Sequence, residues 1–301
     1  MLDVNNRNYS VVNAFTDETI GGNPAAIFPK SEGLNAEEMQ RIAKQLNLVE
    51  TVFISPSEQA NIDRELRFFT PSKELPVAGH PSVAAWASLA HEGEISLERS
   101  TFFQKTLAGV QQIEISKGKE LFVVFMQQQP PRFLNIETDR NLVAKVFGID
   151  QADLNPNLPI QAVDTGLGHI IVPINDLNGL MKASRNIDLL QELCARLGAR
   201  EAQLFCLETR NPNLDLHTRN LCPREGMEDP ACGVGNGALG AYLARHHFGG
   251  QPETYLKAEQ GHIVNMPSVI HIKVSVADDN FKISIGGSAK IMKKDVFEFA
   301  L

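Results

Sequence analysis

Residues 228–244, EDPACGVGNGALGAYLA, place a cysteine beside four closely spaced glycines. The glycines could cradle a phosphate, as in a dinucleotide-binding loop, and Cys232 could be a reactive thiol at the start of a helix. A dinucleotide loop follows directly on a buried strand, whereas here Glu228, Asp229 and Pro230 come first, and two carboxylates would repel a pyrophosphate. The stretch therefore favours a helix N-terminus whose free N–H groups and dipole bind a small anion, such as a substrate carboxylate.

The four cysteines and eight histidines do not follow the spacing of a metal site. The chain has no CxxC motif, and His246 and His247 have no further ligand nearby in the sequence. Bound metal and a disulfide framework are therefore not expected, and a reducing cytoplasm fits this cysteine usage.

The charge balance and hydropathy of the chain exclude two classes of partner. The net charge is -8, and no basic run exceeds Lys293-Lys294, so nucleic acid is not an expected partner. No segment approaches the roughly 18 apolar residues of a membrane span, and residues 1–15 lack a signal-peptide pattern. We expect a cytoplasmic protein that is neither exported nor inserted into a membrane.

Short segments of alternating polarity dominate the chain and predict strands whose spacing suits antiparallel sheets. They cover residues 9–15, 65–70, 111–116, 120–125, 169–174, 214–221, 269–276 and 281–287. A capping-box pattern at Asn35 opens an amphipathic helix whose apolar face is lined by Met39, Ile42, Ala43 and Leu46. A second amphipathic helix spans Asn186 to Leu197, with Cys194 in the core and Gly198 as its C-terminal cap.

Two further helices, residues 81–90 and 235–244, contain no charged residue. A helix that is apolar on all sides must be enclosed. In a chain rich in antiparallel strands, a curved sheet around each central helix provides that enclosure. The expected fold is therefore α+β, with two similar halves.

A repeat in the sequence supports these two halves. Asn186 lies 151 residues after Asn35, Phe205 lies 152 after Phe53, and Cys232 lies 154 after Ala78. We interpret this as a duplicated module, with an N-terminal half at 1–127 plus a returning strand at 288–301 and a C-terminal half at 128–287. Chance similarity between short Ala/Gly-rich helices is the alternative.

Five motifs in order resemble the PhzF-like isomerase family of the diaminopimelate epimerase superfamily: AFTDETIGGNPAAIF (14–28), LNLVETVFI (46–54), RFFTPSKELPVAGHPSVAA (67–85), DTGLGHIIVPI (164–174) and EDPACGVGNGALGAYL (228–243). The resemblance extends to the GGSAKIM stretch near the C-terminus. It implies two pseudo-symmetric halves, each a sheet around a central helix, with the active site in the cleft between them. It also implies cofactor-free proton transfer on a small carboxylate-bearing substrate, and a homodimer.

On this resemblance, the acid/base glutamate of the family corresponds to Glu50, its histidine to His80 and its aspartate to Asp229. Glu50 stands among Leu48, Val49, Val52 and Phe53, and partial desolvation there would raise the pKa of the carboxyl. His80 would orient substrate or relay protons, and Asp229 would fix His80 or bind a polar group of the substrate. The structural alternatives are that Glu50 is a solvated acid at a helix end, that His80 is a polar cap before Pro81 and that Asp229 is a turn residue before Pro230.

Cys232 stands where the PhzF-like family often has Thr, and Val234 where the phenazine enzyme has Ser. In the related amino-acid epimerases a cysteine at each central helix forms a pair of bases, but Ala78 occupies the partner position here. A helix N-terminus favours the thiolate, so Cys232 could assist as a base. Cys232 could also simply fill a tight turn.

The expected function is therefore an isomerase that moves a proton on a small carboxylated molecule without a cofactor. Its catalytic residues would be Glu50, His80, Asp229 and Cys232, and its substrate-binding residues Asn23, Gly79, Gly166, Gly233, Val234 and Gly235. An epimerase or racemase that uses Cys232 is one alternative. A small-molecule-binding protein without catalysis is the other.

Overall fold

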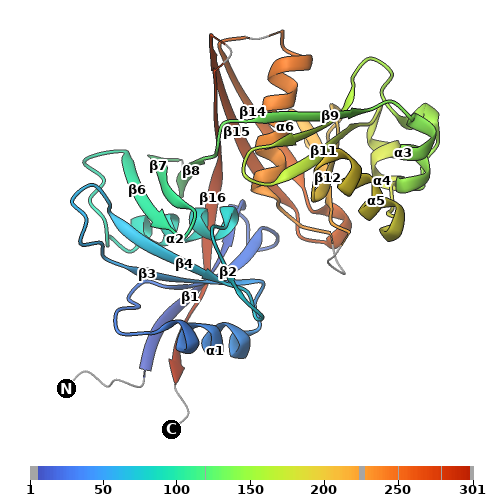
Figure 1. Ribbon diagram of the computed structural model, residues 1–301. Helices are drawn as coiled ribbons and strands as arrows, with labels where there is room; N and C mark the ends of the chain where they lie inside the picture. The colour runs from blue at the N-terminus through green and yellow to red at the C-terminus, as the bar shows by residue number, and fades with distance from the viewer. Residues whose placement is uncertain (1–5, 119, 224–227, 250, 279, 299–301) are drawn as a thin grey trace. The chain divides into compact units, whose positions relative to one another are not determined.

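The computed structural model describes residues 6–118, 120–223, 228–249, 251–278 and 280–298. The chain divides into two compact units. Unit 1 comprises residues 1–126 and 286–301, and unit 2 comprises residues 127–285. Each unit contains a mixed sheet with few helices (Figure 1).

Unit 1 contains β1 (Asn6–Ala14), β2 (Asn23–Phe28), α1 (Ala36–Leu46), β3 (Glu50–Ser55), β4 (Arg64–Phe69), β5 (Glu74–Leu75), α2 (Gly79–His91), β6 (Thr101–Thr106), β7 (Gly109–Lys117) and β8 (Phe122–Gln127). The long strand β16 (Asn280–Glu298) runs on from unit 2 into this unit. The strand order is β1-β2-β3-β4-β6-β7-β8-β16, and β16 also pairs with β1. The strands of unit 1 therefore close into a barrel-like ring, which leaves no long free edge.

Unit 2 contains β9 (Arg132–Glu137), α3 (Arg140–Phe147), η1 (Gln151–Asp153), β10 (Ile160–Asp164), β11 (Gly168–Pro173), α4 (Leu177–Lys182), α5 (Ile187–Leu197), β12 (Glu201–Cys206), β13 (Leu216–Leu221), α6 (Gly233–His246), β14 (Glu253–Gln260), η2 (His262–Val264) and β15 (Ser268–Ala277). Its strands follow the order β16-β15-β14-β13-β12-β11-β10-β9.

Within the described ranges four strand pairs are parallel, in sheets that the sequence predicted to be mostly antiparallel. They are β2–β3, β4–β6, β11–β12 and β13–β14. A parallel pair needs a crossover connection, and each of these pairs has a helix between its strands: α1, α2, α5 and α6 respectively. The two amphipathic helices α1 and α5 and the two enclosed helices α2 and α6 are therefore the crossovers of their units.

The uncharged helix α2 is enclosed in unit 1. Every residue from His80 to Ala90 is buried, and the helix packs against β1, β2 and β3. The indole N–H of Trp86 donates to Oε1 of Gln104, 2.8 Å away, so the one polar atom of this ring is satisfied inside the core. The helix begins at Gly79, two residues earlier than its composition indicated, so His80 lies in its first turn.

Helix α6 is enclosed in unit 2 by β10, β11, β12, β14 and β15. A Cβ atom at Gly240 would lie 2.5 Å from Cγ2 of Ile272, so this glycine allows β15 to approach the helix closely. The hydroxyl of Tyr242 donates to the carbonyl of Pro159 at 2.6 Å. Helix α6 also begins two residues before the predicted start.

The two amphipathic helices form as predicted. Asn35 and Glu38 make both hydrogen bonds of a capping box at the start of α1. Gly198 ends α5 with a left-handed φ of 76°, and Cys194 lies in the core of unit 2. That the two units arose by duplication stays a prediction.

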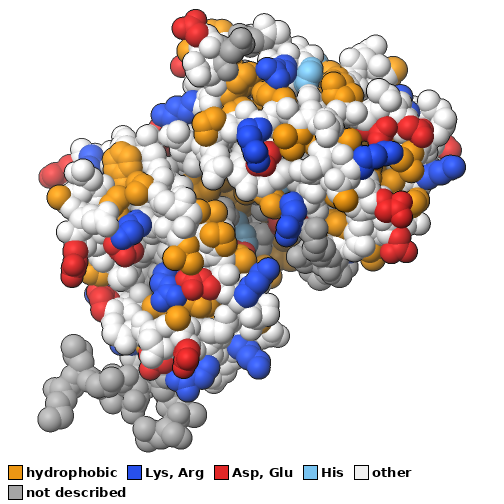
Figure 2. Space-filling view, in the orientation of Figure 1, with side chains coloured by type: hydrophobic (Ala, Val, Ile, Leu, Met, Phe, Trp, Pro, Cys, Tyr) orange, Lys and Arg blue, Asp and Glu red, His pale blue; other side chains and the backbone are white. Residues whose placement is uncertain are grey.

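The outer surface carries both signs of charge. On the face shown in Figure 2, Lys and Arg side chains are interspersed with Asp and Glu side chains over each unit. Within the described ranges, none of the helices combines the length and the apolar character needed to cross a bilayer.

Candidate active site

Glu50 is placed by the end of α1. The chain leaves this helix at Asn47, which has a left-handed φ of 50° and donates its backbone N–H to the carbonyl of Ala43. Asn tolerates this conformation better than most residues. Three residues later, Glu50 begins β3 and lies opposite Ala25 of β2 in the parallel register.

Glu50 and His80 lie close together in unit 1. Oε2 of Glu50 is 3.8 Å from Nε2 of His80, and the two side chains are only 13% and 10% exposed. Burial lowers the pKa of His80 to about 3, although a hydrogen bond from the ring to the backbone carbonyl of Pro24 opposes this shift. His80 is therefore neutral at physiological pH.

The apolar surroundings of Glu50 differ from those expected. Val49 is 56% exposed and gives no shielding. Phe53 lies in the cluster beneath α1, on the opposite face of β3, because successive side chains of a strand alternate. Val52, two residues after Glu50, is buried and shares its face. The carboxyl of Glu50 is therefore shielded from water by helix α2 as well as by its own strand.

The other predicted residues of unit 1 are close in the fold. Asn23 begins β2 and is 2% exposed, and Gly79 is the first residue of α2. Ala78 precedes α2 as its N-cap and makes no side-chain capping bond. We refer to Asn23, Glu50, Gly79 and His80 as the unit 1 group.

Asp229 lies just before α6 in unit 2. Its Oδ1 accepts a hydrogen bond from the N–H of Ala231 at 2.9 Å, and its backbone pairs with Asn220 in an isolated bridge. Burial, together with the charge of Glu201, raises the pKa of Asp229 to about 6. This carboxyl therefore changes charge near neutral pH.

Cys232 is the N-cap of α6, and its sulfur accepts a hydrogen bond from the N–H of Gly235 at 3.3 Å. Burial raises the pKa of Cys232 well above its usual value, and the charges of Asp229 and Glu201 add to this. The helix N-terminus acts in the opposite direction but does not outweigh them. The expectation that the helix favours the thiolate is therefore wrong for this structure, and Cys232 is a thiol.

His169 and Glu201 complete this cluster, and the sequence analysis included neither among the site residues. Nε2 of His169 lies 3.2 Å from Oε2 of Glu201 and 3.6 Å from Sγ of Cys232. The two residues face each other across the parallel pair β11–β12. Burial opposes ionisation of Glu201, but hydrogen bonds to His169, Asn220 and Cys222 outweigh it and lower its pKa.

One signal in the sequence pointed to Glu201. It lies 151 residues after Glu50, the same interval that separates the two helix starts Asn35 and Asn186. Both glutamates are the first residues of their strands. We refer to His169, Glu201, Asp229 and Cys232 as the unit 2 group.

Glycine allows His169 and Gln203 to approach α6. A Cβ atom at Gly235 would lie 2.4 Å from Oε1 of Gln203 and 3.1 Å from Cδ2 of His169. The N–H groups of Val234 and Gly235 are directed to the sulfur of Cys232, so an anion at this helix N-terminus competes with that sulfur. The carbonyl of Gly233 accepts a hydrogen bond from Gln128 at 3.1 Å.

Gly166 lies in the loop before β11. Its φ of 127° is one that glycine adopts readily, and its N–H donates to Oδ1 of Asp164 at 2.7 Å. Thr165 of the same loop donates a long hydrogen bond of 3.5 Å to the carbonyl of Val234. The loop is therefore held against the first turn of α6.

Buried polar side chains support the unit 2 group. Gln260 donates to the carbonyl of Asp229 at 2.8 Å, and its own oxygen accepts from Asn236 at 2.8 Å. Arg219 forms a buried two-point ion pair with Glu228, the residue before Asp229, in which Nε donates to Oε1 and Nη2 donates to Oε2. These contacts hold the segment that carries Asp229 in one position.

Three members of the unit 2 group have the donor types of a metal site. One ligand atom each of His169, Glu201 and Cys232 lies within 4.8 Å of the other two. Zinc binds these donor types. The three side chains also satisfy one another through hydrogen bonds, so the arrangement does not require an ion.

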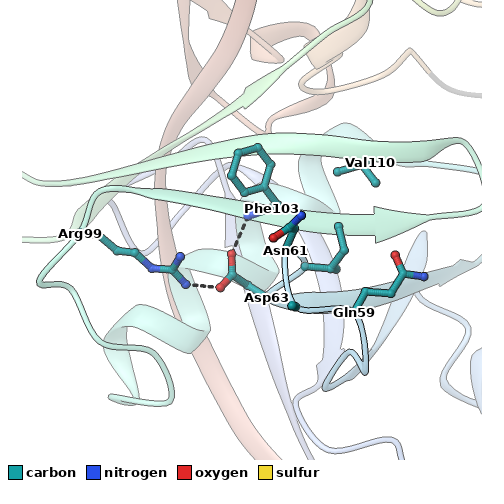
Figure 3. A pocket seen from close by; sticks show the side chains of 8 residues that line it. Gln59, Asn61, Asp63, Arg99, Phe103 and Val110 are labelled. Atoms are coloured by element: carbon teal, nitrogen blue, oxygen red, sulfur yellow. Dashed lines mark hydrogen bonds and ion pairs between the residues drawn. The ribbon is translucent and has the colours of Figure 1, made fainter.

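A hollow of about 690 Å³ lies elsewhere on unit 1 (Figure 3). Its wall includes Asp63, whose carboxylate accepts from the N–H of Phe103 at 2.8 Å and pairs with Arg99. None of the candidate residues described above lines it. The hollow is therefore separate from the unit 1 group.

The profile of the family described as phenazine biosynthesis-like protein matches residues 12–295. The chain belongs to this family. It is 32% identical over 289 residues to an uncharacterized isomerase of Clostridium acetobutylicum, covering 94% of this chain and 95% of that protein. It is also 32% identical over 278 residues to the uncharacterized isomerase YfhB of Bacillus subtilis, covering 92% and 93%.

The structure agrees with that of a family member from Bacillus anthracis, a phenazine biosynthesis protein of the PhzF family. The TM-score is 0.89 at 28% identity, and the match covers 98% of this chain and 99% of the other. The predictions that the chain belongs to this family and that it is an isomerase are therefore confirmed.

Proposed function

We propose that this isomerase moves a proton on a small carboxylate-bearing molecule, with Glu50 as the acid/base group and without a cofactor. The observation that carries the proposal is the nearly buried pair of Glu50 and His80. A carboxyl with restricted access to water can hold a substrate proton long enough to return it.

The state of His80 favours this role for Glu50. The ring donates one N–H to the carbonyl of Pro24, and its neutral form leaves the other nitrogen, Nε2, as an acceptor. Nε2 faces Glu50. It can therefore accept a hydrogen bond from the protonated carboxyl after a small approach, which holds the proton between transfers. His80 thus positions Glu50 and its proton.

Asp229 and Cys232 are proposed to contact the substrate from the unit 2 group. Because the pKa of Asp229 is raised to about 6, its carboxyl can accept a hydrogen bond from a polar group of the substrate when ionised and donate one when protonated. Cys232 is proposed as an assisting residue, while Asn23, Gly79, Gly166, Gly233, Val234 and Gly235 are proposed to bind substrate through their backbone or side-chain polar groups. The helix N-termini next to Gly79 and Gly233 suit a carboxylate.

One carboxyl can take a proton from one carbon and return it to another carbon on the same face. The expected product is therefore a positional isomer that retains part of the original proton, because a shielded carboxyl exchanges slowly with water. Neither a metal nor an organic cofactor is needed for such a transfer when a neighbouring group already acidifies the C–H bond.

An epimerase or racemase that uses Cys232 is the second candidate, because Sγ of Cys232 lies 3.6 Å from Nε2 of His169. Nδ1 of His169 lies 2.9 Å from the carbonyl of Leu167, and Nε2 also lies 3.2 Å from the carboxylate of Glu201. Because both of these oxygens only accept, Nε2 carries a proton, and its N–H would stabilise the Cys232 thiolate that forms when the thiol gives its proton to the substrate. Two-base inversion needs a second base on the opposite face of the substrate. Ala78, at the partner position, cannot supply it.

We also propose that the two units are pseudo-symmetric halves of the fold. Both units have the order strand, helix, strand, strand, helix, strand over β2 to β6 and β11 to β14, apart from the short β5 and α4. In both, a glutamate begins the strand after the first crossover helix. This supports two pseudo-symmetric α+β halves that arose by duplication.

A heavy-water experiment tests the proposed function. The protein is incubated in D₂O with a panel of small carboxylates whose C–H bonds are acidified by a neighbouring double bond, ketone or amine, and mass spectrometry and proton NMR follow deuterium uptake and product structure. A positional isomer with partial proton retention supports the proposal. A mirror-image product with complete deuterium label contradicts it and favours the Cys232 mechanism.

A further inference from the structure

A second cluster of metal-binding side chains lies in unit 2, outside the unit 2 group. His217 on β13 and Glu259 on β14 are opposite each other in the parallel register, and His262 begins the η2 turn three residues after Glu259. One ligand atom from each residue lies within 4.8 Å of the other two. The two imidazole rings are 5.0 Å apart between centroids.

Two nitrogen atoms of this cluster are buried without a visible role. Within the described part of the chain, neither Nε2 of His217 nor Nδ1 of His262 has a hydrogen-bond partner. His217 is fully buried, with 0% exposure. A buried polar atom without a partner destabilises the folded state, so two of them on neighbouring rings need an explanation.

Hydrogen bonding determines which nitrogen of His217 is available. Nδ1 lies 2.7 Å from Oε1 of Glu259. Since a carboxylate only accepts, Nδ1 carries the proton and Nε2 has a free electron pair. A carboxylate that holds one ring nitrogen while the other binds the ion is the usual arrangement around zinc-binding histidines.

The charges of the cluster also suit a cation. The carboxylate of Glu259 accepts hydrogen bonds from Nδ1 of His217 and from the backbone N–H groups of Arg210 and Asn211, and these bonds favour its charged form. The cluster thus combines a hydrogen-bonded carboxylate with two imidazole rings, groups that bind metal ions in their deprotonated forms.

We propose that His217, Glu259 and His262 form a site for a divalent transition-metal ion, with Zn²⁺ as its preferred occupant. His217 and His262 bind the ion through the two partnerless nitrogens, and Glu259 orients His217 and supplies the negative charge. Imidazole ligands with a carboxylate select zinc and its neighbours over magnesium or calcium, which prefer oxygen.

The ion would tie the η2 turn to β13. Gly261, next to His262, has a φ of 87°, and a Cβ atom there would lie 2.7 Å from the carbonyl of Pro230. Gln260, the preceding residue, holds the carbonyl of Asp229. The proposed ion would therefore stabilise the turn that packs against the segment carrying Asp229.

Zinc binding to the full-length protein, without a polyhistidine tag and after chelator treatment, tests this site. Isothermal titration with ZnCl₂ is expected to give one site per chain, and zinc is expected to raise the melting temperature. His262→Gln is expected to weaken zinc binding by at least about 100-fold and to abolish this stabilisation, and Glu259→Gln is expected to weaken binding by about 10- to 100-fold. His91→Gln, which removes an exposed histidine of unit 1, is the matched control and is expected to bind as the wild type does.

Three results would overturn the assignment. They are no zinc binding by the wild type, unchanged binding by His262→Gln, and binding that survives His262→Gln but is lost in Cys232→Ser, which would place the ion on the other cluster. Circular dichroism checks that each variant is folded. His262→Gln is also expected to retain proton exchange in D₂O, so a failure of the metal site is distinguishable from a failure of the proposed reaction.

Discussion

Glu50 and Glu201 occupy equivalent positions in two strands, and each faces a histidine. Each is the first residue of its strand, β3 or β12, and the carboxylate oxygens lie 3.8 Å from Nε2 of His80 and 3.2 Å from Nε2 of His169 respectively. The two proposed reactions differ in which of these glutamates they need. Single substitutions therefore discriminate between them.

Glu50→Gln is expected to lower the rate of deuterium exchange into substrate by about 10²- to 10⁴-fold, because it removes the proton carrier. Glu201→Gln is expected to lower it by less than about tenfold. Glu253→Gln, at an exposed strand start, is the control and is expected to be neutral. The initial rates of deuterium exchange are measured by proton NMR. A larger loss of rate in Glu201→Gln than in Glu50→Gln would favour the Cys232 mechanism.

His80 and Asp229 are expected to change the free energy of unfolding with pH in opposite directions. His80 has a pKa of about 3 in the folded protein against the ordinary value of 6.5 in the unfolded chain, so the unfolded state binds the extra proton. Its contribution to stability is therefore complete above about pH 6.5 and is lost as the pH falls towards 3, at about 1.4 kcal/mol per pH unit. Asp229, with a pKa of about 6 against 3.8, binds the extra proton in the folded state and gains stability as the pH falls from 6 to 3.8.

Urea unfolding at pH 7.5 and pH 5 separates these two effects. His80→Asn is expected to lose less stability between the two pH values than the wild type, and Asp229→Asn is expected to lose more. The opposite order would show that burial does not shift these two groups as the structure indicates.

Cys232→Thr is expected to keep most of the activity and all of the stability. Threonine is a good N-cap residue, and its hydroxyl can accept the hydrogen bond from Gly235 that the sulfur now accepts. Cys232→Ala removes this cap and is expected to cost about 1 kcal/mol. A loss of activity in Cys232→Thr as large as that in Glu50→Gln would instead assign the main base to Cys232.

Cys232 is also expected to resist alkylation. All four cysteines are buried, and the raised pKa of Cys232 keeps it as the unreactive thiol. Mass spectrometry after iodoacetamide treatment at pH 8 should find the native protein far less modified than the urea-unfolded one. Rapid labelling of Cys232 in the native protein would indicate a thiolate.

The protein is expected to be a homodimer, as the family resemblance implies. Sedimentation velocity at micromolar concentration is expected to give a mass close to twice the chain mass of 33.1 kDa. A single species at the chain mass over this concentration range would refute the dimer.

Local patterns in the sequence predicted the elements that depend on local forces. The capping box at Asn35 and the glycine cap at Gly198 form as expected, since their hydrogen bonds join residues within one helical turn. The uncharged stretches after Ala78 and Cys232 correctly predicted two enclosed helices, because a helix without a polar face must be buried on all sides. The succession of motifs also identified the family.

Only the tertiary structure decided which strands pair in parallel and which side chains meet. Phe53 is close to Glu50 in the sequence, but strand alternation places it on the opposite face, beneath α1. His169 and Glu201 are 32 residues apart, and the β11–β12 register brings them to 3.2 Å. Sheet register joins residues that are distant in the chain, and a shift of one residue reverses every side chain, so no local pattern contains this information. The same physical reason applies to the pKa of Cys232. Burial and the carboxylates that the fold brings near the thiol raise this pKa, and they outweigh the effect of the helix N-terminus.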